Sequence, residues 1–91
     1  MRKYRTLLKP YLRNILNHVR DENGVTQEEM SHRLYMSTRS YCDLESGKSG
    51  FSAATLIFLL SCLPDDVIVQ VVRGFFELVL KEREKEVPNR E

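Results

Sequence analysis

The chain has 91 residues, of which 42% are hydrophobic and 30% charged, a size and composition typical of a single domain rather than of two domains or a disordered segment. Lys and Arg total 14 against 13 Asp and Glu, which gives a formal net charge of +1. This balance excludes a strongly basic nucleic-acid-binding tail and an acidic, self-repelling segment, so any charge that serves function must be local.

Cysteine usage and the start of the sequence favour a cytoplasmic protein. Cys42 and Cys62 are too few and too far apart for a disulfide framework or a zinc ribbon, which suits a reducing compartment. Basic residues recur from position 2 to position 13 before an apolar segment can form, so we expect no secretory signal. The longest charge-free stretch, 49–64, is shorter than the roughly 20 apolar residues that span a bilayer. It predicts a buried helix, and no membrane partner is expected.

The first helix is expected to begin at Pro10 and to end at Asn23 and Gly24. Its apolar residues keep helical spacing: Leu12, Ile15, Leu16 and Val19. Gly24 can supply a left-handed C-cap. Pro10 would break a longer helix, so residues 1–9 are expected to add at most a separate turn.

The second helix has a complete set of N-terminal signals and is expected to begin at Gln27. Thr26 and Glu29 have the spacing of a capping box, and Val25 and Met30 occupy the positions of a hydrophobic staple. A third helix follows after about three residues. Ser37 can cap it, Tyr41 and Leu44 are expected to point inward, and Gly47 can end it.

The fourth helix follows Ser52 and is expected to be central, because nearly all of its sides are apolar. Its apolar residues are Leu56, Ile57, Leu59, Leu60 and Leu63. Pro64 then starts a fifth helix over residues 64–86, with Asp65 and Asp66 at the positive end of its dipole. The run 67–72 is rich in β-branched residues, but its apolar positions keep helical spacing for more than three turns, so we predict a helix. Residues 87–91 are expected to fray into solvent.

Two short helices joined by a tight turn are thus predicted within residues 26–48, TQEEMSHRLYMSTRSYCDLESGK. This segment resembles the helix-turn-helix of the Cro and lambda-repressor-like family of DNA-binding regulators. The resemblance extends upstream through LNHVRDENGV and downstream through GKSGFSAATLIFLLSCL, and it covers residues 12–63. It implies one all-α domain over 1–91, a five-helix bundle with the helix-turn-helix at its second and third helices. The helix over 64–86 is then a possible dimerisation element.

The resemblance also implies which residues contact double-stranded DNA, since the third helix of this family lies in the major groove. By position, the base-reading residues are Thr38, Arg39, Cys42 and Asp43. Arg39 is the strongest of them, because its guanidinium can bond guanine O6 and N7 together. The implied phosphate contacts are Gln27, Ser37, Ser46, Gly47 and Lys48. The family pattern further implies a structural ion pair between Arg20 and Glu45.

The chain departs from the family pattern at several positions. Tyr35 replaces a glycine that is often found in the turn, at a cost of about 1 kcal/mol if the backbone there is left-handed. Tyr41 replaces a smaller aliphatic residue. Asp43 brings a negative charge toward the groove, and Lys48 is the one basic residue directly after the third helix. These departures keep a second hypothesis open, in which the chain is a protein-interaction module, antitoxin-like or a scaffold, without strong DNA binding.

Other chemistry-bearing residues have simpler interpretations. His18 and His32 lack ligand spacing and are expected to be surface residues, so no metal site is predicted. Cys42 is interpreted as an inert small residue rather than a redox-sensitive thiol. We find no nucleophile with a base at recognisable spacing, no phosphate-cradling loop and no cofactor motif. We therefore expect neither an enzyme nor a cofactor or small-molecule ligand, and we favour a transcriptional regulator, most simply a repressor.

The fifth helix carries more apolar surface than a four-helix core can cover. We therefore expect a homodimer joined through this helix, because an exposed apolar patch of this kind marks an interaction site. The interface is expected to contain Val72, Phe75, Phe76 and Val79. In the alternative, the helix packs on residues 4–8 and is buried within the monomer.

Overall fold

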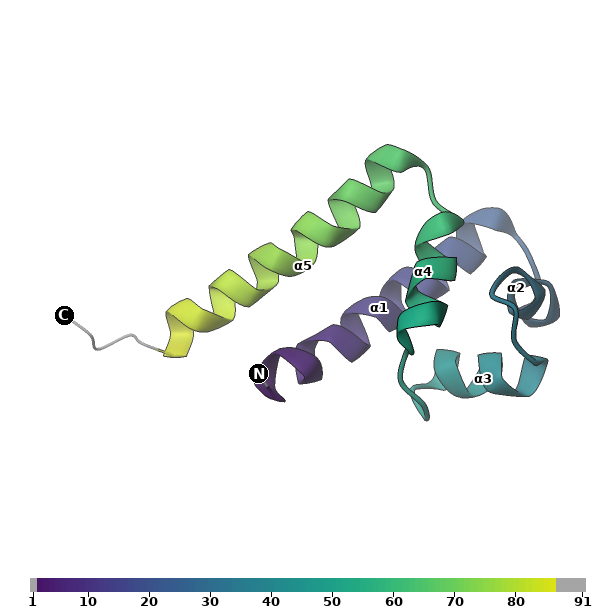
Figure 1. The fold of residues 1–91 in the computed structure, drawn as a ribbon, viewed down its shortest axis with the longest axis horizontal. Coiled ribbons are helices and arrows are strands. Elements are labelled where there is room, and N and C mark those ends of the chain that lie inside the picture. The colour runs from purple at the N-terminus through teal and green to yellow at the C-terminus, as the bar shows by residue number, and fades with distance from the viewer. Residues whose placement is uncertain (1, 87–91) are drawn as a thin grey trace.

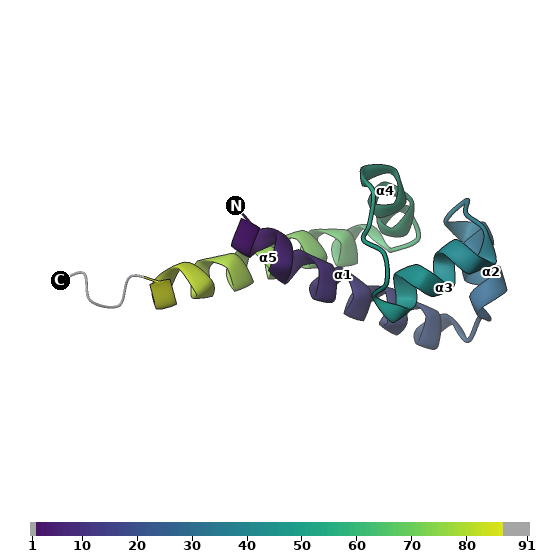
Figure 2. The same cartoon turned by 90° about the horizontal axis from the view of Figure 1, so that it is seen from below.

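The computed structural model describes residues 2–86, and within that range the chain forms five helices and no strand. The helices are α1 (Arg2–Asn23), α2 (Gln27–Arg33), α3 (Thr38–Ser46), α4 (Ala53–Ser61) and α5 (Asp65–Glu86). The predicted all-α class is therefore confirmed, and the frayed tail expected at 87–91 lies outside the described residues. The molecule is elongated, 52 × 28 × 21 Å. The long helices α1 and α5 run antiparallel, while α2 and α3 form the opposite end of the molecule from the C-terminal half of α5 (Figures 1 and 2).

The limits of α2 and α3 follow the local signals in the sequence. Thr26 Oγ1 accepts a hydrogen bond from the Glu29 backbone N–H at 3.1 Å, and Glu29 Oε1 accepts one from the Thr26 N–H at 2.9 Å. This reciprocal capping box satisfies two N–H groups that the helix itself leaves unpaired. Ser37 caps α3 by accepting from the Ser40 N–H at 3.1 Å, and Gly47 ends it with φ +89°. The predicted starts of α2 and α3 are confirmed.

The core lies where α1, α2, α3 and α4 meet. Its buried members come from all four helices and from the turn after α2: Leu16, Val19, Met30, Leu34, Tyr41, Leu44 and Leu59. Ser31 is also fully buried, and its hydroxyl donates to the Glu28 carbonyl at 2.6 Å. A small residue at this position lets α2 approach α3 closely.

The turn between α2 and α3 is left-handed at Tyr35, whose φ is +57°. A non-glycine residue in this region costs about 1 kcal/mol or more, because its Cβ approaches the following carbonyl oxygen. The Tyr35 ring is largely exposed, yet it packs on Phe58 of α4 with ring centroids 4.7 Å apart. An aromatic pair of this kind is worth about 0.5 to 1.5 kcal/mol. It offsets the backbone strain and links the turn to α4.

The expected start of the first helix at Pro10 is wrong, because α1 begins at Arg2 and continues through Pro10. A proline inside a helix removes one hydrogen bond and costs about 3 kcal/mol. Packing outweighs this cost. Leu7 and Leu8, which precede the proline, are half-buried, and Tyr11 directly after it contacts α5. Most helical stability in proteins comes from packing of an apolar face rather than from local propensity.

The central, buried position expected for the fourth helix is also wrong. Within α4 only Leu59 is fully buried, and Ile57 keeps 61% of its surface exposed. The reason lies in the path of α5, which turns away after Pro64 and pairs with α1 instead of covering the outer side of α4 (Figure 1). One side of α4 therefore faces solvent.

Replacing Pro10 tests the continuity of α1. We expect Pro10→Ala to raise the free energy of unfolding by about 1 to 2 kcal/mol, because alanine restores a helical hydrogen bond. The gain is smaller than the full cost of the proline, because alanine also gives the unfolded chain more conformational freedom. Urea denaturation followed by circular dichroism measures this change. An unchanged or lower stability would contradict an uninterrupted helix through residue 10.

Candidate nucleic-acid interface

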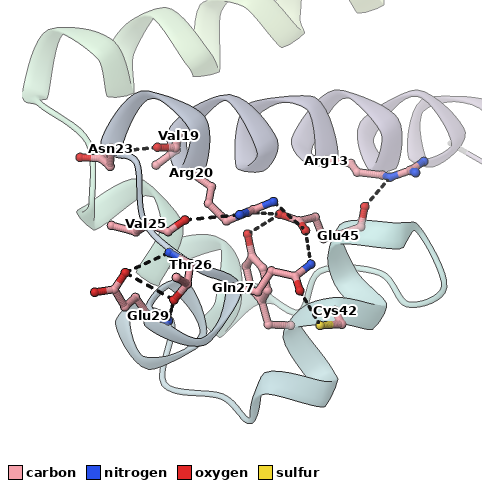
Figure 3. Close-up of polar contacts among 11 residues, drawn as sticks. Arg13, Val19, Arg20, Asn23, Val25, Thr26, Gln27, Glu29, Cys42 and Glu45 are labelled. Carbon is pink, nitrogen blue, oxygen red and sulfur yellow. Dashed lines mark hydrogen bonds and ion pairs between the residues drawn. The ribbon is translucent and has the colours of Figure 1, made fainter.

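The Glu45 carboxylate is the point at which α1, α2 and α3 are joined (Figure 3). Arg20 of α1 donates to Oε2 from Nε at 2.6 Å and to Oε1 from Nη2 at 3.4 Å. Gln27 of α2 donates to Oε1 from Nε2 at 2.6 Å. The Tyr41 hydroxyl, one turn earlier on α3, donates to Oε2 at 2.8 Å. The structure thus brings together the pair expected from the resemblance, Arg20 and Glu45, and adds two neutral donors to it.

The protonation of this cluster is fixed by its hydrogen bonds. Burial alone would raise the pKa of Glu45, but the hydrogen bonds from Gln27, Arg20 and Tyr41 outweigh burial and lower it. The hydrogen bond to Glu45 raises the pKa of Arg20. Burial, followed by the bond to the carboxylate, raises the pKa of Tyr41 far above its usual value. At neutral pH the cluster therefore holds one carboxylate, one guanidinium and one neutral phenol.

A second arginine of α1 binds the same end of α3, through the backbone of Glu45. Arg13 donates from Nε to the Glu45 carbonyl at 2.8 Å, in the last turn of α3. A cation at this place complements the negative end of the helix dipole. Arg13 and Arg20 are seven residues apart, two helical turns, so both project toward α3 (Figure 3). Arg20 also donates to the Val25 carbonyl at 3.3 Å, which fixes the loop between α1 and α2.

The start of α3 faces outward. Ser37, Thr38, Arg39 and Ser40 are all exposed, and the first turn of α3 contains no acidic residue. Thr38 Oγ1 lies 3.4 Å from the Ser31 hydroxyl, while Ser37 and Ser40 hydrogen-bond to each other at 3.0 Å. This end of α3 therefore presents hydroxyls, one guanidinium and the positive end of a helix dipole to solvent.

The turn that follows α3 is organised around the Asp43 carbonyl. It accepts from the backbone N–H of Lys48 at 2.8 Å and of Ser49 at 3.2 Å, and from the Ser46 hydroxyl at 3.2 Å. The Lys48 side chain is exposed, and the Asp43 side chain is half-buried. The backbone of this expected phosphate-contacting segment is thus fixed, and its basic side chain faces solvent.

Two expected DNA-contacting side chains point into the protein instead. The Gln27 amide donates to Glu45, and its Oε1 lies 3.4 Å from the Cys42 thiol, which donates to it. Gln27 and Cys42 are both half-buried between α2 and α3. A charged carboxylate is a stronger acceptor than water or a neutral group, so the amide turns toward Glu45. In this conformation Gln27 and Cys42 connect α2 to α3.

Tyr41 and Arg13 belong to this cluster, although neither was predicted to contact Glu45. Tyr41 was interpreted only as an apolar inward residue, although Tyr41 and Glu45 have the four-residue spacing that brings side chains together on a helix. Arg13 has the two-turn spacing from Arg20 that predicts a shared face. Both spacings are visible in the sequence once Arg20 and Glu45 are taken as a pair.

Acid titration tests the state of Glu45. A carboxylate with a lowered pKa in the folded state stabilises the protein fully above its ordinary value of 4.5, and this contribution is lost as the pH falls through the folded-state value. Glu45→Gln should therefore cost about 2 to 4 kcal/mol at neutral pH and flatten the loss of stability below pH 4.5. Thermal melting across the acid range measures both effects, with the exposed Glu84→Gln as control. A wild-type acid profile in Glu45→Gln would contradict this role.

A pair of glycine substitutions tests the contact of Arg13 with the end of α3. Gly24 and Gly47 both have positive φ, so alanine costs about 1 kcal/mol at either position. A Cβ at Gly47 would also lie 3.0 Å from Arg13 Nη1, whereas a Cβ at Gly24 meets nothing within 4 Å. We expect Gly47→Ala to lower the free energy of unfolding by about 1 kcal/mol more than Gly24→Ala. In an Arg13→Ala background the two substitutions should cost the same, and a difference that persists there would exclude Arg13 as its cause.

Comparison with known proteins identifies no relative of this chain. The chain matches no protein-family model, no curated protein and no solved structure. Across residues 2–86, none of the helices is both long enough and apolar enough to cross a bilayer.

Proposed function

We propose that the chain is a sequence-specific DNA-binding transcriptional regulator, most simply a repressor, that reads the major groove of double-stranded DNA with α3. The observation that carries the proposal is the division of α3 into two faces. One face is fixed to α1 and α2 through Tyr41 and Glu45, and the exposed start of the helix carries Thr38 and Arg39. A helix held rigidly with its N-terminal residues outward is what base-edge contact in a groove requires.

The charge distribution supports the same surface. The negative charge of Glu45 points inward and is neutralised by Arg20, whose side chain is 28% exposed. Arg39 and Lys48 are exposed, whereas Asp43 is half-buried. The face of α3 and its following turn is thus slightly positive although the whole chain is almost neutral. Asp43 is compatible with this surface where it accepts a hydrogen bond from cytosine N4.

The small number of cations limits the affinity of a single copy. Each phosphate neutralised by a protein cation releases counterions and steepens the fall of affinity with salt. With Lys48 as the basic residue of the turn and Arg39 assigned to a base, we expect a shallow salt slope of about one per copy. Hydroxyls such as Ser37 and Ser46 add neutral phosphate contacts that leave this slope unchanged.

Single substitutions separate base reading from phosphate contact. A duplex site is first selected from random sequence with the full chain. Arg39→Ala is then expected to lose the preference for one G·C pair, at a cost of about 1 to 3 kcal/mol, while Lys48→Ala weakens all sequences alike and lowers the salt slope by about one. Arg73→Ala, which removes an exposed positive charge from α5, is the matched control and should leave both quantities unchanged.

Two outcomes would contradict the assignment of α3 as a DNA-reading helix. If Arg39→Ala retains the wild-type site profile, Arg39 does not read a base. If the wild-type chain shows no duplex binding that weakens with salt, the alternative function is favoured, in which the helical domain binds another protein. The specific observation in favour of that alternative is the sparse basic surface, with Arg39 and Lys48 as the exposed cations of α3 and its following turn and with Asp43 beside them.

A further inference from the structure

Helix α5 has an inner face that is already occupied by α1. The Tyr11 hydroxyl donates to the Val71 carbonyl at 2.6 Å, and the Tyr11 ring packs on Phe75 with centroids 5.4 Å apart. A Cβ at Gly74 would lie 2.5 Å from the same hydroxyl, so the absence of a side chain there permits this close approach. Phe75, expected at the centre of a dimer interface, therefore serves the contact between α1 and α5 within one chain.

A second apolar face of α5 lies open to solvent. We call it the outer stripe, and it consists of Val69, Val72, Phe76 and Leu80. These side chains keep 54%, 57%, 59% and 39% of their surface exposed. At about 100° per residue their intervals of three and four place them within roughly 80° of one another around the helix. Of the four residues expected at a dimer interface, Val72 and Phe76 belong to the stripe, while Val79 at its edge is half-buried.

Opposite charges stand at the two ends of the outer stripe. Asp65 lies one turn before Val69, and Arg83 lies about one turn after Leu80. The two residues are 18 positions apart, which is five full turns, so both fall on the same face of the helix as the stripe. Both are exposed. The face thus carries a carboxylate at its start, four apolar side chains and a guanidinium at its end.

We propose that a second copy of this chain docks on the outer stripe with the two α5 helices antiparallel. A two-fold axis that passes between Val72 and Phe76 places Val72 of one copy opposite Phe76 of the other. The same axis places Val69 of one copy opposite Leu80 of the other. The same axis places Asp65 of each copy opposite Arg83 of the other. A parallel arrangement would instead bring the two Asp65 carboxylates together, and like charges in register are destabilising.

The charge pattern favours a second copy as the occupant. When two copies lie antiparallel, the acidic end of each stripe meets the basic end of the other. A two-fold interface uses one patch twice, so a patch with an acid at one end and a base at the other satisfies both of its ends with a single partner. This assembly goes beyond the proposed function and does not depend on it, since no residue of α3 takes part.

Sedimentation equilibrium of the full chain tests the assembly. The wild-type chain is expected to dimerise below about 100 μM, and Phe76→Ala to raise the dimer dissociation constant by about thirtyfold or more, as for a central aromatic residue. Ile57→Ala removes an equally exposed apolar side chain from α4 and should change nothing. Circular dichroism melts confirm that each variant is folded. A wild-type monomer at 100 μM overturns the proposal, as does unchanged dimerisation of Phe76→Ala.

Charge exchange tests the antiparallel orientation. Asp65→Arg and Arg83→Asp alone should each weaken the dimer by at least about fivefold, and the double variant should recover most of this loss, because its exchanged charges again face opposite ones. The matched controls, Asp66→Arg and Lys81→Asp, make the same charge changes on neighbouring exposed positions outside the stripe and should have less effect. A double variant no better than the single ones overturns the antiparallel arrangement. Duplex binding by the same variants is measured separately, so failure of the dimer and failure of the DNA-binding proposal are distinguished.

Discussion

The arrangement of α1, α2 and α3 depends on the Glu45 carboxylate. Placing a carboxylate in a half-buried site is costly, and hydrogen bonds from Arg20, Gln27 and Tyr41 offset that cost. The dependence is mutual, because the buried Tyr41 hydroxyl and the Arg20 guanidinium would lose their main acceptor without it. Each donor comes from a different helix, so the carboxylate sets the orientation of α3 relative to the rest of the domain. The exposed start of α3 is a consequence of this inner attachment.

Features encoded within a few residues were predictable from the sequence, and features decided by distant packing were not. The capping box at Thr26 and Glu29 needs only the backbone of one helical turn, so its residues identify it. The continuity of α1 through Pro10 depends on α5, which lies more than fifty residues away in the chain. The exposure of one side of α4 likewise depends on a distant feature, the path of α5, which does not cover it. The hydrogen bond from the Gln27 side chain to Glu45, 18 residues later in the chain, was likewise not predictable from the local sequence.

The apolar pattern of α5 predicts that the helix has more than one covered face, but it does not predict which residues belong to each face. Its surplus of apolar residues indicated that one helix had to cover two surfaces. Which residues served which surface depended on Tyr11, because its ring and hydroxyl select Phe75 and Gly74 for the inner face. Phe75 and Phe76 are adjacent, and they point about 100° apart around the helix. Adjacent aromatic residues therefore cannot both be assigned to one interface from composition alone.

The sparse basic surface and the outer stripe are physically connected under the two proposals. A single α3 with Arg39 and Lys48 as its exposed cations contacts few phosphates, so one copy is held weakly on a duplex. Joining two copies makes the second contact intramolecular, which can raise the overall affinity by two or more orders of magnitude without any new contact to DNA. A two-fold pairing through α5 also requires that the DNA site repeat with the same symmetry. A nearly neutral chain thus gains affinity and sequence information from assembly rather than from additional positive charge.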